Sequence, residues 1–186
     1  RWAERSDNLR VLVLGGSLGA KPINDVVLAT WQKLSEAQRP TLWHQTGRAH
    51  EEQVQQAYQT ARIAARAEAF IEDMAAAYSW ADVVICRAGA LTVAELAAAG
   101  VPALLVPLPH AIDDHQRANA QWFVDGGAGE IIDQSVFNAD VLCKWLESDS
   151  ANRESLLNSA EAARRLAKID AADVAANYCM EFANES

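Results

Sequence analysis

Cysteine is scarce in this sequence, and no long apolar run occurs. The three cysteines, Cys86, Cys143 and Cys179, lie far apart and form no CxxC pair, so neither a zinc site nor a disulfide framework is indicated. We expect all three to be small buried hydrophobic side chains. No segment approaches the ~20 apolar residues of a membrane helix, and residues 1–10 lack the apolar core of a signal peptide. These absences predict a chain of cytoplasmic type that does not insert into a membrane.

Positive charge is also in short supply. The chain has 16 Lys and Arg against 25 Asp and Glu, which gives a formal net charge of -9. A nucleic-acid-binding face needs clustered Lys and Arg to neutralise phosphates, and an anionic membrane surface likewise attracts basic segments. We therefore expect no nucleic-acid partner and no direct docking of this chain on a membrane. With 186 residues, 51% of them hydrophobic, the chain is long enough to bury the core of one domain.

Short apolar segments alternate with helical patterns along the chain. The expected strands are 9–16, 41–47, 67–71, 82–86, 101–109 and 128–132. The expected helices are 22–35, 50–66, 73–81, 90–99, 113–127 and a helical remainder over 136–184 with a break around 148–152. This alternation predicts an α/β fold in which a parallel sheet is covered on both faces. No linker or internal repeat interrupts it, so residues 1–186 are expected to form a single domain with a core over about 9–170.

Ligands of such sheets bind at the carboxyl ends of the strands. The stretch "GGSLGA" follows the first expected strand, where glycines allow close backbone approach and the next helix N-terminus favours an anion. A phosphate contact and a tight turn without ligand are both open interpretations. The spacing is not G-x-G-x-x-G, and the second strand ends in His44 and Gln45 rather than an acid. These two departures argue against a nicotinamide-dependent oxidoreductase.

The stretch "CRAGALTVAEL" follows the fourth expected strand. Gly89 permits a close turn, and the free N–H groups of about Ala90 to Val93 would point out of the helix end towards an anion. Glu95 lies four positions after Leu91, on the same helical face, where its carboxylate can accept hydrogen bonds from the two hydroxyls of a ribose. The pattern therefore indicates a diphosphate and ribose seat. An ordinary helix N-terminal signature is the alternative.

The stretch "PLPHAIDDHQRANA" brings several polar side chains to the start of the next helix. Gln116 and Asn119 are three residues apart and share a face, so they form a candidate pair for sugar hydroxyls, with His115 beside them. The simpler interpretation is that Asp113 or Asp114 caps the helix. These two acids are adjacent and do not form the spaced Asp-x-Asp pair that holds a divalent ion against a diphosphate. We therefore expect no metal and no cofactor.

Taken together, "GGSLGA", "FIEDMAAAYSWADVVICRAGALTVAELAAAGVPALLVPLPHAIDDHQRANA" and "GAGEII" resemble the C-terminal, donor-binding half of the MurG family, over about residues 9–175. The resemblance implies an inverting glycosyltransferase that transfers N-acetylglucosamine (GlcNAc) from UDP-GlcNAc to lipid I, the lipid-linked muramoyl pentapeptide, forming lipid II in peptidoglycan synthesis. It also implies a Rossmann-like three-layer sandwich that is one half of a two-domain fold.

The resemblance further implies which residues contact the donor. They are Ser17, Phe70, Ile71, Ala90, Leu91, Thr92, Val93, Ala94, Glu95, His115, Gln116 and Asn119. By this resemblance Ser17 lies near the phosphates, the Ile71 backbone recognises uracil, Glu95 binds ribose and Gln116 binds the GlcNAc hydroxyls. Leu18 departs from the glutamine that many members carry in the glycine loop.

The family's other domain carries the remaining functions. The resemblance implies that the N-terminal domain supplies the acceptor site, the catalytic base and the membrane-docking surface, and that the full-length protein is peripheral on the cytoplasmic face of the bacterial inner membrane. We therefore expect no catalytic residue in this chain, which alone would bind donor without turnover. Two alternatives stay open: a UDP-GlcNAc epimerase-like domain, and a non-catalytic nucleotide-binding or interaction module.

The C-terminal segment 171–186 is the last expectation. In the family this helix packs on the N-terminal domain, and here it carries the apolar residues Val174, Tyr178, Met180 and Phe182. Without that domain, we expect the segment to be frayed, repositioned or covered by another copy of the chain.

Overall fold

A six-stranded parallel sheet lies at the centre of the part of the chain that the structure describes. The structure is a computed structural model, and it describes residues 8–16, 19–109 and 114–184. The strand order is β3-β2-β1-β4-β5-β6. The strands are β1 (Arg10–Leu14), β2 (Thr41–Gln45), β3 (Ala65–Glu68), β4 (Val83–Cys86), β5 (Ala103–Leu105) and β6 (Gly129–Ile131). Because β2 and β4 both pair with β1, the chain changes direction across the sheet between β1 and β4.

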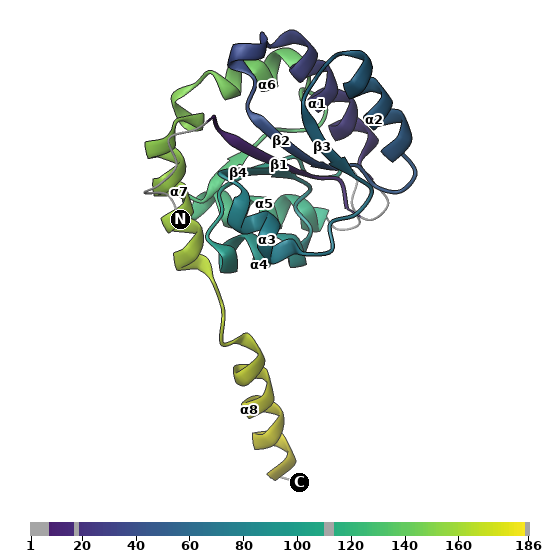
Figure 1. Cartoon of the computed structure of the whole chain (residues 1–186). Coiled ribbons are helices and arrows are strands. Elements are labelled where there is room, and N and C mark those ends of the chain that lie inside the picture. The colour runs from purple at the N-terminus through teal and green to yellow at the C-terminus, as the bar shows by residue number, and fades with distance from the viewer. Residues whose placement is uncertain (1–7, 17–18, 110–113, 185–186) are drawn as a thin grey trace.

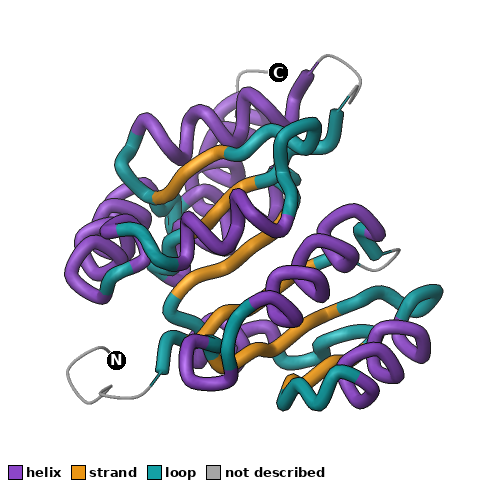
Figure 2. Tube along the Cα trace, turned by 90° about the horizontal axis from the view of Figure 1, so that it is seen from above, coloured by secondary structure: helices purple, strands orange, loops and turns teal. Residues whose placement is uncertain are grey.

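Helices cover both faces of this sheet, as Figure 2 shows from above. Their bounds are α1 (Lys21–Lys33), α2 (Glu51–Thr60), α3 (Met74–Trp80), α4 (Ala90–Ala99), α5 (His115–Asp125), α6 (Ala139–Leu146), α7 (Arg153–Leu166) and α8 (Ala171–Asn184). In Figure 1, α1, α2 and α6 lie on one side of the strands, and α3, α4 and α5 lie on the other. The expected Rossmann-like three-layer fold is confirmed.

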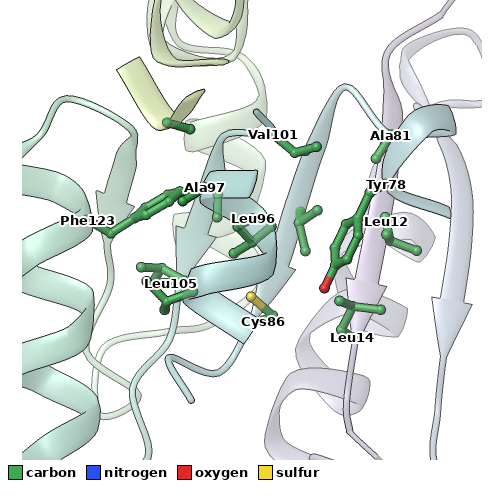
Figure 3. Close-up of a cluster of buried hydrophobic side chains, with 14 of the residues drawn as sticks. Leu12, Leu14, Tyr78, Ala81, Cys86, Leu96, Ala97, Val101, Leu105 and Phe123 are labelled. Carbon is green, nitrogen blue, oxygen red and sulfur yellow. The ribbon is translucent and has the colours of Figure 1, made fainter. Parts of the chain in front are cut away.

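Two hydrophobic cores explain the uninterrupted apolar run of β1. Val11 and Val13 pack towards α1, α2 and α6, whereas Leu12 and Leu14 pack towards α3, α4 and α5. Figure 3 shows the second core, in which Tyr78 lies beside Leu12 and Leu14. A central parallel strand must be apolar on both faces because helices cover both. The buried run is therefore a direct consequence of the strand's place in the sheet.

Several element boundaries differ from the sequence prediction. The helix expected over 50–66 ends at Thr60, and Arg62 has a positive φ of 53°. The third strand is Ala65–Glu68 rather than 67–71. Its residues are only partly buried or exposed, because it is an edge strand. Its alanine-rich sequence therefore lacks the apolar pattern of a central strand and instead continues the helical pattern that precedes it. The fifth strand is Ala103–Leu105 rather than 101–109, and the C-terminal helical region is also interrupted between Leu166 and Ala171. The remaining elements fall close to their expected positions, and Gly100 ends α4 with a positive φ of 63°.

Helix α8 extends away from the sheet and the other helices (Figure 1). Val174, Tyr178 and Met180 are 59%, 63% and 57% exposed, and the side chain of Phe182 lies outside the described residues. The expectation that all three cysteines are buried is wrong: Cys86 is buried, but Cys143 is partly exposed and Cys179, on α8, is exposed. Within the described ranges, every helix is too short or too polar to cross a membrane.

Candidate functional site

A pocket of about 300 Å³ opens at the carboxyl ends of β1, β2 and β4. It lies where the strand order reverses between β1 and β4, which is the usual ligand position in doubly wound sheets. Its lining residues are Leu14, Gly15, Gly16, Gln45, Phe70, Met74, Tyr78, Cys86, Arg87, Thr92 and Glu95. The fold thus brings together three features predicted separately from the sequence: the glycine loop, the start of α4 and the residue Phe70.

The glycine loop forms the wall on the β1 side. The Gly15 N–H donates to the Gln45 carbonyl at 3.0 Å, which ties the loop to the end of β2. A Cβ at Gly15 would lie 2.9 Å from that carbonyl oxygen, and a Cβ at Gly19 would lie 2.5 Å from the Thr46 carbonyl oxygen. The glycines are therefore required by close backbone packing, with or without a ligand. Ser17 and Leu18 lie outside the described residues.

The start of α4 supplies hydrogen-bond donors. Gly89 is the N-cap and offers no side chain. The Val93 N–H donates to the Gly89 carbonyl at 2.9 Å, so the prediction that Val93 is among the free donors is wrong, because its N–H closes the first helical turn. Within the described residues, the N–H groups of Ala90, Leu91 and Thr92 remain without a hydrogen-bond partner. Three backbone donors and the positive end of the helix dipole thus point out of the helix.

Glu95 lies one turn further along α4 and lines the same pocket. Thr92, three residues earlier, shares this face with it, whereas Leu91 is 81% exposed and is not part of the lining. The Tyr78 hydroxyl donates to Glu95 Oε2 at 2.8 Å. Burial of Tyr78, and after it the hydrogen bond to Glu95, raises the pKa of the phenol. The tyrosine therefore stays protonated and acts as a hydrogen-bond donor to the carboxylate.

Arg87 brings a positive charge to the pocket. Its Nη1 donates to the Val106 and Pro107 carbonyls at 2.9 and 3.1 Å, and its Nη2 bonds to Gln134. Half-burial lowers the pKa of the guanidinium, which nevertheless remains charged in proteins. The sequence prediction missed Arg87, Tyr78 and Gln45, although Arg87 directly follows β4, at the end of the sheet where ligands were expected.

Phe70 separates this pocket from a second one of about 480 Å³. Phe70 is 49% exposed and lines both. Ile71 lines the second pocket, but only 2% of its residue surface is exposed, so it offers a ligand very little surface. On the same edge the Arg66 guanidinium lies 3.7 Å from the centre of the Trp43 ring. The predicted uracil-binding residues therefore lie beside the pocket that holds Glu95.

The three predicted residues of α5 do not line the 300 Å³ pocket. The Gln116 side-chain carbonyl accepts from the Leu108 N–H at 2.9 Å, and Asn119 Nδ2 donates to the Ala88 carbonyl at 3.0 Å. Asn119 thus anchors the residue that precedes Gly89, while His115 is exposed. Asp114 occupies the N-cap position with a φ of 51° but makes no side-chain capping bond, so the capping interpretation is wrong for Asp114. Asp113 lies outside the described residues.

Potential metal ligands do not cluster in the described part of the chain. Across residues 8–16, 19–109 and 114–184, His, Cys, Asp and Glu form no group of three or more that could hold a metal ion.

The fold and pocket agree with comparisons to known proteins. Residues 10–176 match the model of the glycosyltransferase family 28 C-terminal domain, and the chain belongs to this family. The chain is 50% identical over 184 residues to the UDP-N-acetylglucosamine--N-acetylmuramyl-(pentapeptide) pyrophosphoryl-undecaprenol N-acetylglucosamine transferase of Marinobacter nauticus, covering 99% of this chain and 51% of that protein. It is also 50% identical over 182 residues to the transferase of the same name from Cellvibrio japonicus.

A solved structure gives the same result. The crystal structure of Acinetobacter baumannii MurG matches with a TM-score of 0.87 and 40% identity over 96% of this chain and 51% of that chain. The resemblance to the C-terminal half of the MurG family is therefore confirmed. A glycosyltransferase of kitacinnamycin, at 23% identity and a TM-score of 0.62, shares the fold. The chain spans about half the length of the relatives it matches, and their transferase names do not favour the epimerase or interaction-module alternatives.

Proposed function

We propose that this chain is the donor-binding half of a GlcNAc transferase. It binds UDP-GlcNAc in the 300 Å³ pocket at the carboxyl ends of β1, β2 and β4. One observation carries the proposal: Gly15 and Gly16 of the glycine loop, Thr92 at the start of α4 and Glu95 line one pocket, beside the helix end that carries three free N–H groups. An anion is stabilised at such a helix end, and a carboxylate one turn away suits the hydroxyls of a ribose attached to it. The membership in glycosyltransferase family 28 supports the same substrate class.

In this proposal the chain stabilises the leaving group. When the acceptor hydroxyl displaces UDP from the anomeric carbon, negative charge develops on the diphosphate. The free N–H groups of Ala90, Leu91 and Thr92 would stabilise that charge, and removal of one such donor costs about 3 kcal/mol in enzymes. Arg87 adds a fixed positive charge at the same end of the sheet. Ser17 would contact the phosphates from the glycine loop.

The base and sugar ends of the donor are assigned by the same proposal. The Ile71 backbone would meet the uracil edge with Phe70 as a wall, and Gln116 would meet the GlcNAc hydroxyls, supported by His115 and Asn119. Ala94, which is exposed, would complete the donor-binding run at the start of α4, whereas Val93 is buried and its N–H is bonded within the helix. Gln116 already accepts one backbone hydrogen bond, which leaves its amide group to donate.

The remaining functions belong in this proposal to the other half of the enzyme. That half would bind lipid I, supply the catalytic base and attach the full-length protein to the cytoplasmic face of the inner membrane. The 186-residue chain would bind donor without transferring the sugar. Transfer of labelled GlcNAc to a lipid I analogue by this polypeptide alone would contradict that division.

A calorimetric titration tests the donor site. We expect saturable binding of UDP-GlcNAc and UDP and no heat change with NADH. Glu95→Gln keeps the side-chain shape but weakens UDP binding by about 10- to 100-fold, because a hydrogen bond to a charged group contributes about 1.5–3 kcal/mol. Glu52→Gln, which changes an exposed carboxylate on α2, is the matched control and should bind like the original chain. Equal UDP affinity in both variants would contradict the ribose contact.

A further inference from the structure

We infer that Tyr78 is a positioning residue of the nucleotide site, which fixes the Glu95 carboxylate in the orientation that selects a ribose. This inference rests on the proposed function and adds to it a residue on a different helix. Tyr78 belongs to α3, whereas Glu95 belongs to α4. Their hydrogen bond at 2.8 Å is a direct side-chain link between these two walls of the pocket.

The tyrosine itself is firmly held. It is only 5% exposed, and Figure 3 shows its ring beside β1, with the hydroxyl oxygen directed towards Leu14 at the carboxyl end of the strand. Helix α3 begins with a side-chain cap, because the Asp73 carboxylate accepts from the Ala76 N–H at 2.8 Å. A buried ring on a capped helix places its hydroxyl at a fixed point, and burial keeps that hydroxyl protonated by raising its pKa.

The Glu95 side chain, in contrast, is exposed to solvent at the pocket and has several rotatable bonds. A free glutamate side chain loses rotamer freedom when it is ordered. The Tyr78 hydroxyl occupies Oε2, which leaves Oε1 to accept from a ligand hydroxyl. A carboxylate already ordered in the free protein reduces the entropic cost of binding. Tyr78 therefore acts on affinity through Glu95, without being required to touch the nucleotide.

The chain contains a matched control for the hydroxyl. Tyr58 is also buried, at 2% exposure, and its hydroxyl also bonds to a polar side chain, at 2.8 Å from His44 Nδ1. It lies in the other core, among α1, α2 and β2, and does not line the pocket. Tyr58→Phe and Tyr78→Phe therefore remove the same atom from comparable surroundings, and both keep the ring that packs in the core.

The experiment compares UDP with 2′,3′-dideoxy-UDP by calorimetry in the original chain and the two variants. Tyr78→Phe should weaken UDP binding by about 3- to 10-fold, which corresponds to losing the ordering of one side chain. Binding of the dideoxy analogue, which has no hydroxyls for Glu95, should stay unchanged. Tyr58→Phe should leave the ratio of the two affinities as it is in the original chain, whatever it does to the melting temperature.

A double variant makes the test specific. If Tyr78 acts through Glu95, adding Tyr78→Phe to Glu95→Gln should change UDP affinity by much less than Tyr78→Phe alone. An unchanged ratio of UDP to dideoxy-UDP affinity in Tyr78→Phe would overturn the inference while leaving the proposed function in place. Absence of UDP binding by the original chain would overturn the proposed function and this inference together.

Discussion

At the scale of single residues, His44 connects the sheet to two helices through a buried polar network. Its Nδ1 lies 2.8 Å from the Tyr58 hydroxyl, and its Nε2 lies 3.0 Å from Asn24 Oδ1. Asn24 in turn donates to the Thr46 carbonyl at 2.9 Å, beside the glycine loop. Because buried polar groups must be hydrogen-bonded, this network helps to fix the end of β2 against α1 and α2.

This network makes folding stability depend on pH. Burial lowers the pKa of His44 from 6.5 to about 3, so between these values the unfolded chain takes up a proton and the folded chain does not. The contribution of His44 is therefore present above pH 6.5 and is lost as the pH falls towards 3. From pH 7 to pH 5 we expect a loss of about 2 kcal/mol in the free energy of unfolding.

Urea unfolding of the original chain and of His44→Gln at several pH values measures this contribution. The variant is less stable at pH 7 because the network is altered, but the loss between pH 7 and pH 5 should be smaller in it by about 2 kcal/mol. The same pH dependence in both proteins would show that burial does not lower the pKa of His44 in the folded chain.

Single residues also show where sequence reasoning reached its limit. Glu95 was predictable because its distance from the helix start fixes its place on the helix. Tyr78 and Arg87 were not predicted, because their roles depend on contacts between elements that sequence spacing does not encode. Val93 was misjudged for a local reason: Gly89 is the N-cap, so the Val93 N–H closes the first turn instead of staying free. The individual donor contacts of the predicted residues stay predictions.

At the scale of elements, most of the fold was predictable because central strands and amphipathic helices have distinct patterns. β1 and β4 are buried on both faces, so their apolar runs were unambiguous. The edge strand β3 was misplaced, because only its neighbour β2 pairs with it and its partly buried and exposed residues follow no alternating pattern. The order of the strands in the sheet came only with the structure.

Helix α8 provides the prediction that belongs to this scale. It projects from the body (Figure 1), its apolar residues Val174 and Met180 are more than half exposed, and an isolated helix of 14 residues is marginally stable in water. We expect fast amide hydrogen exchange over 176–184 in the monomer and slow exchange in β1 and β4. Strong protection of α8 in a monomer would contradict this expectation, whereas protection that rises with protein concentration would indicate cover by another copy.

At the scale of the whole molecule, the described residues that we propose for phosphate and ribose binding, at the start of α4 and at Glu95, lie at the carboxyl end of the sheet. The strand reversal between β1 and β4 opens the pocket there, and α3, α4 and the glycine loop surround it. A different groove, lined by residues that include Gly129 and Ser155, lies at the opposite, amino end of the strands. Ligand binding at the two ends of the sheet affects different residues. A measurement in solution can therefore tell at which end the donor binds.

The most direct measurement is an NMR titration of the ¹⁵N-labelled chain with UDP, following each backbone amide. The account predicts saturable shifts that are largest at Gly15 and Gly16 and at the amides of 90–92, with Glu95→Gln weakening the apparent affinity at all of them. Shifts confined to the amino end of the sheet around Gly129, or no shifts at all, would contradict the central claim that the start of α4 is the diphosphate seat.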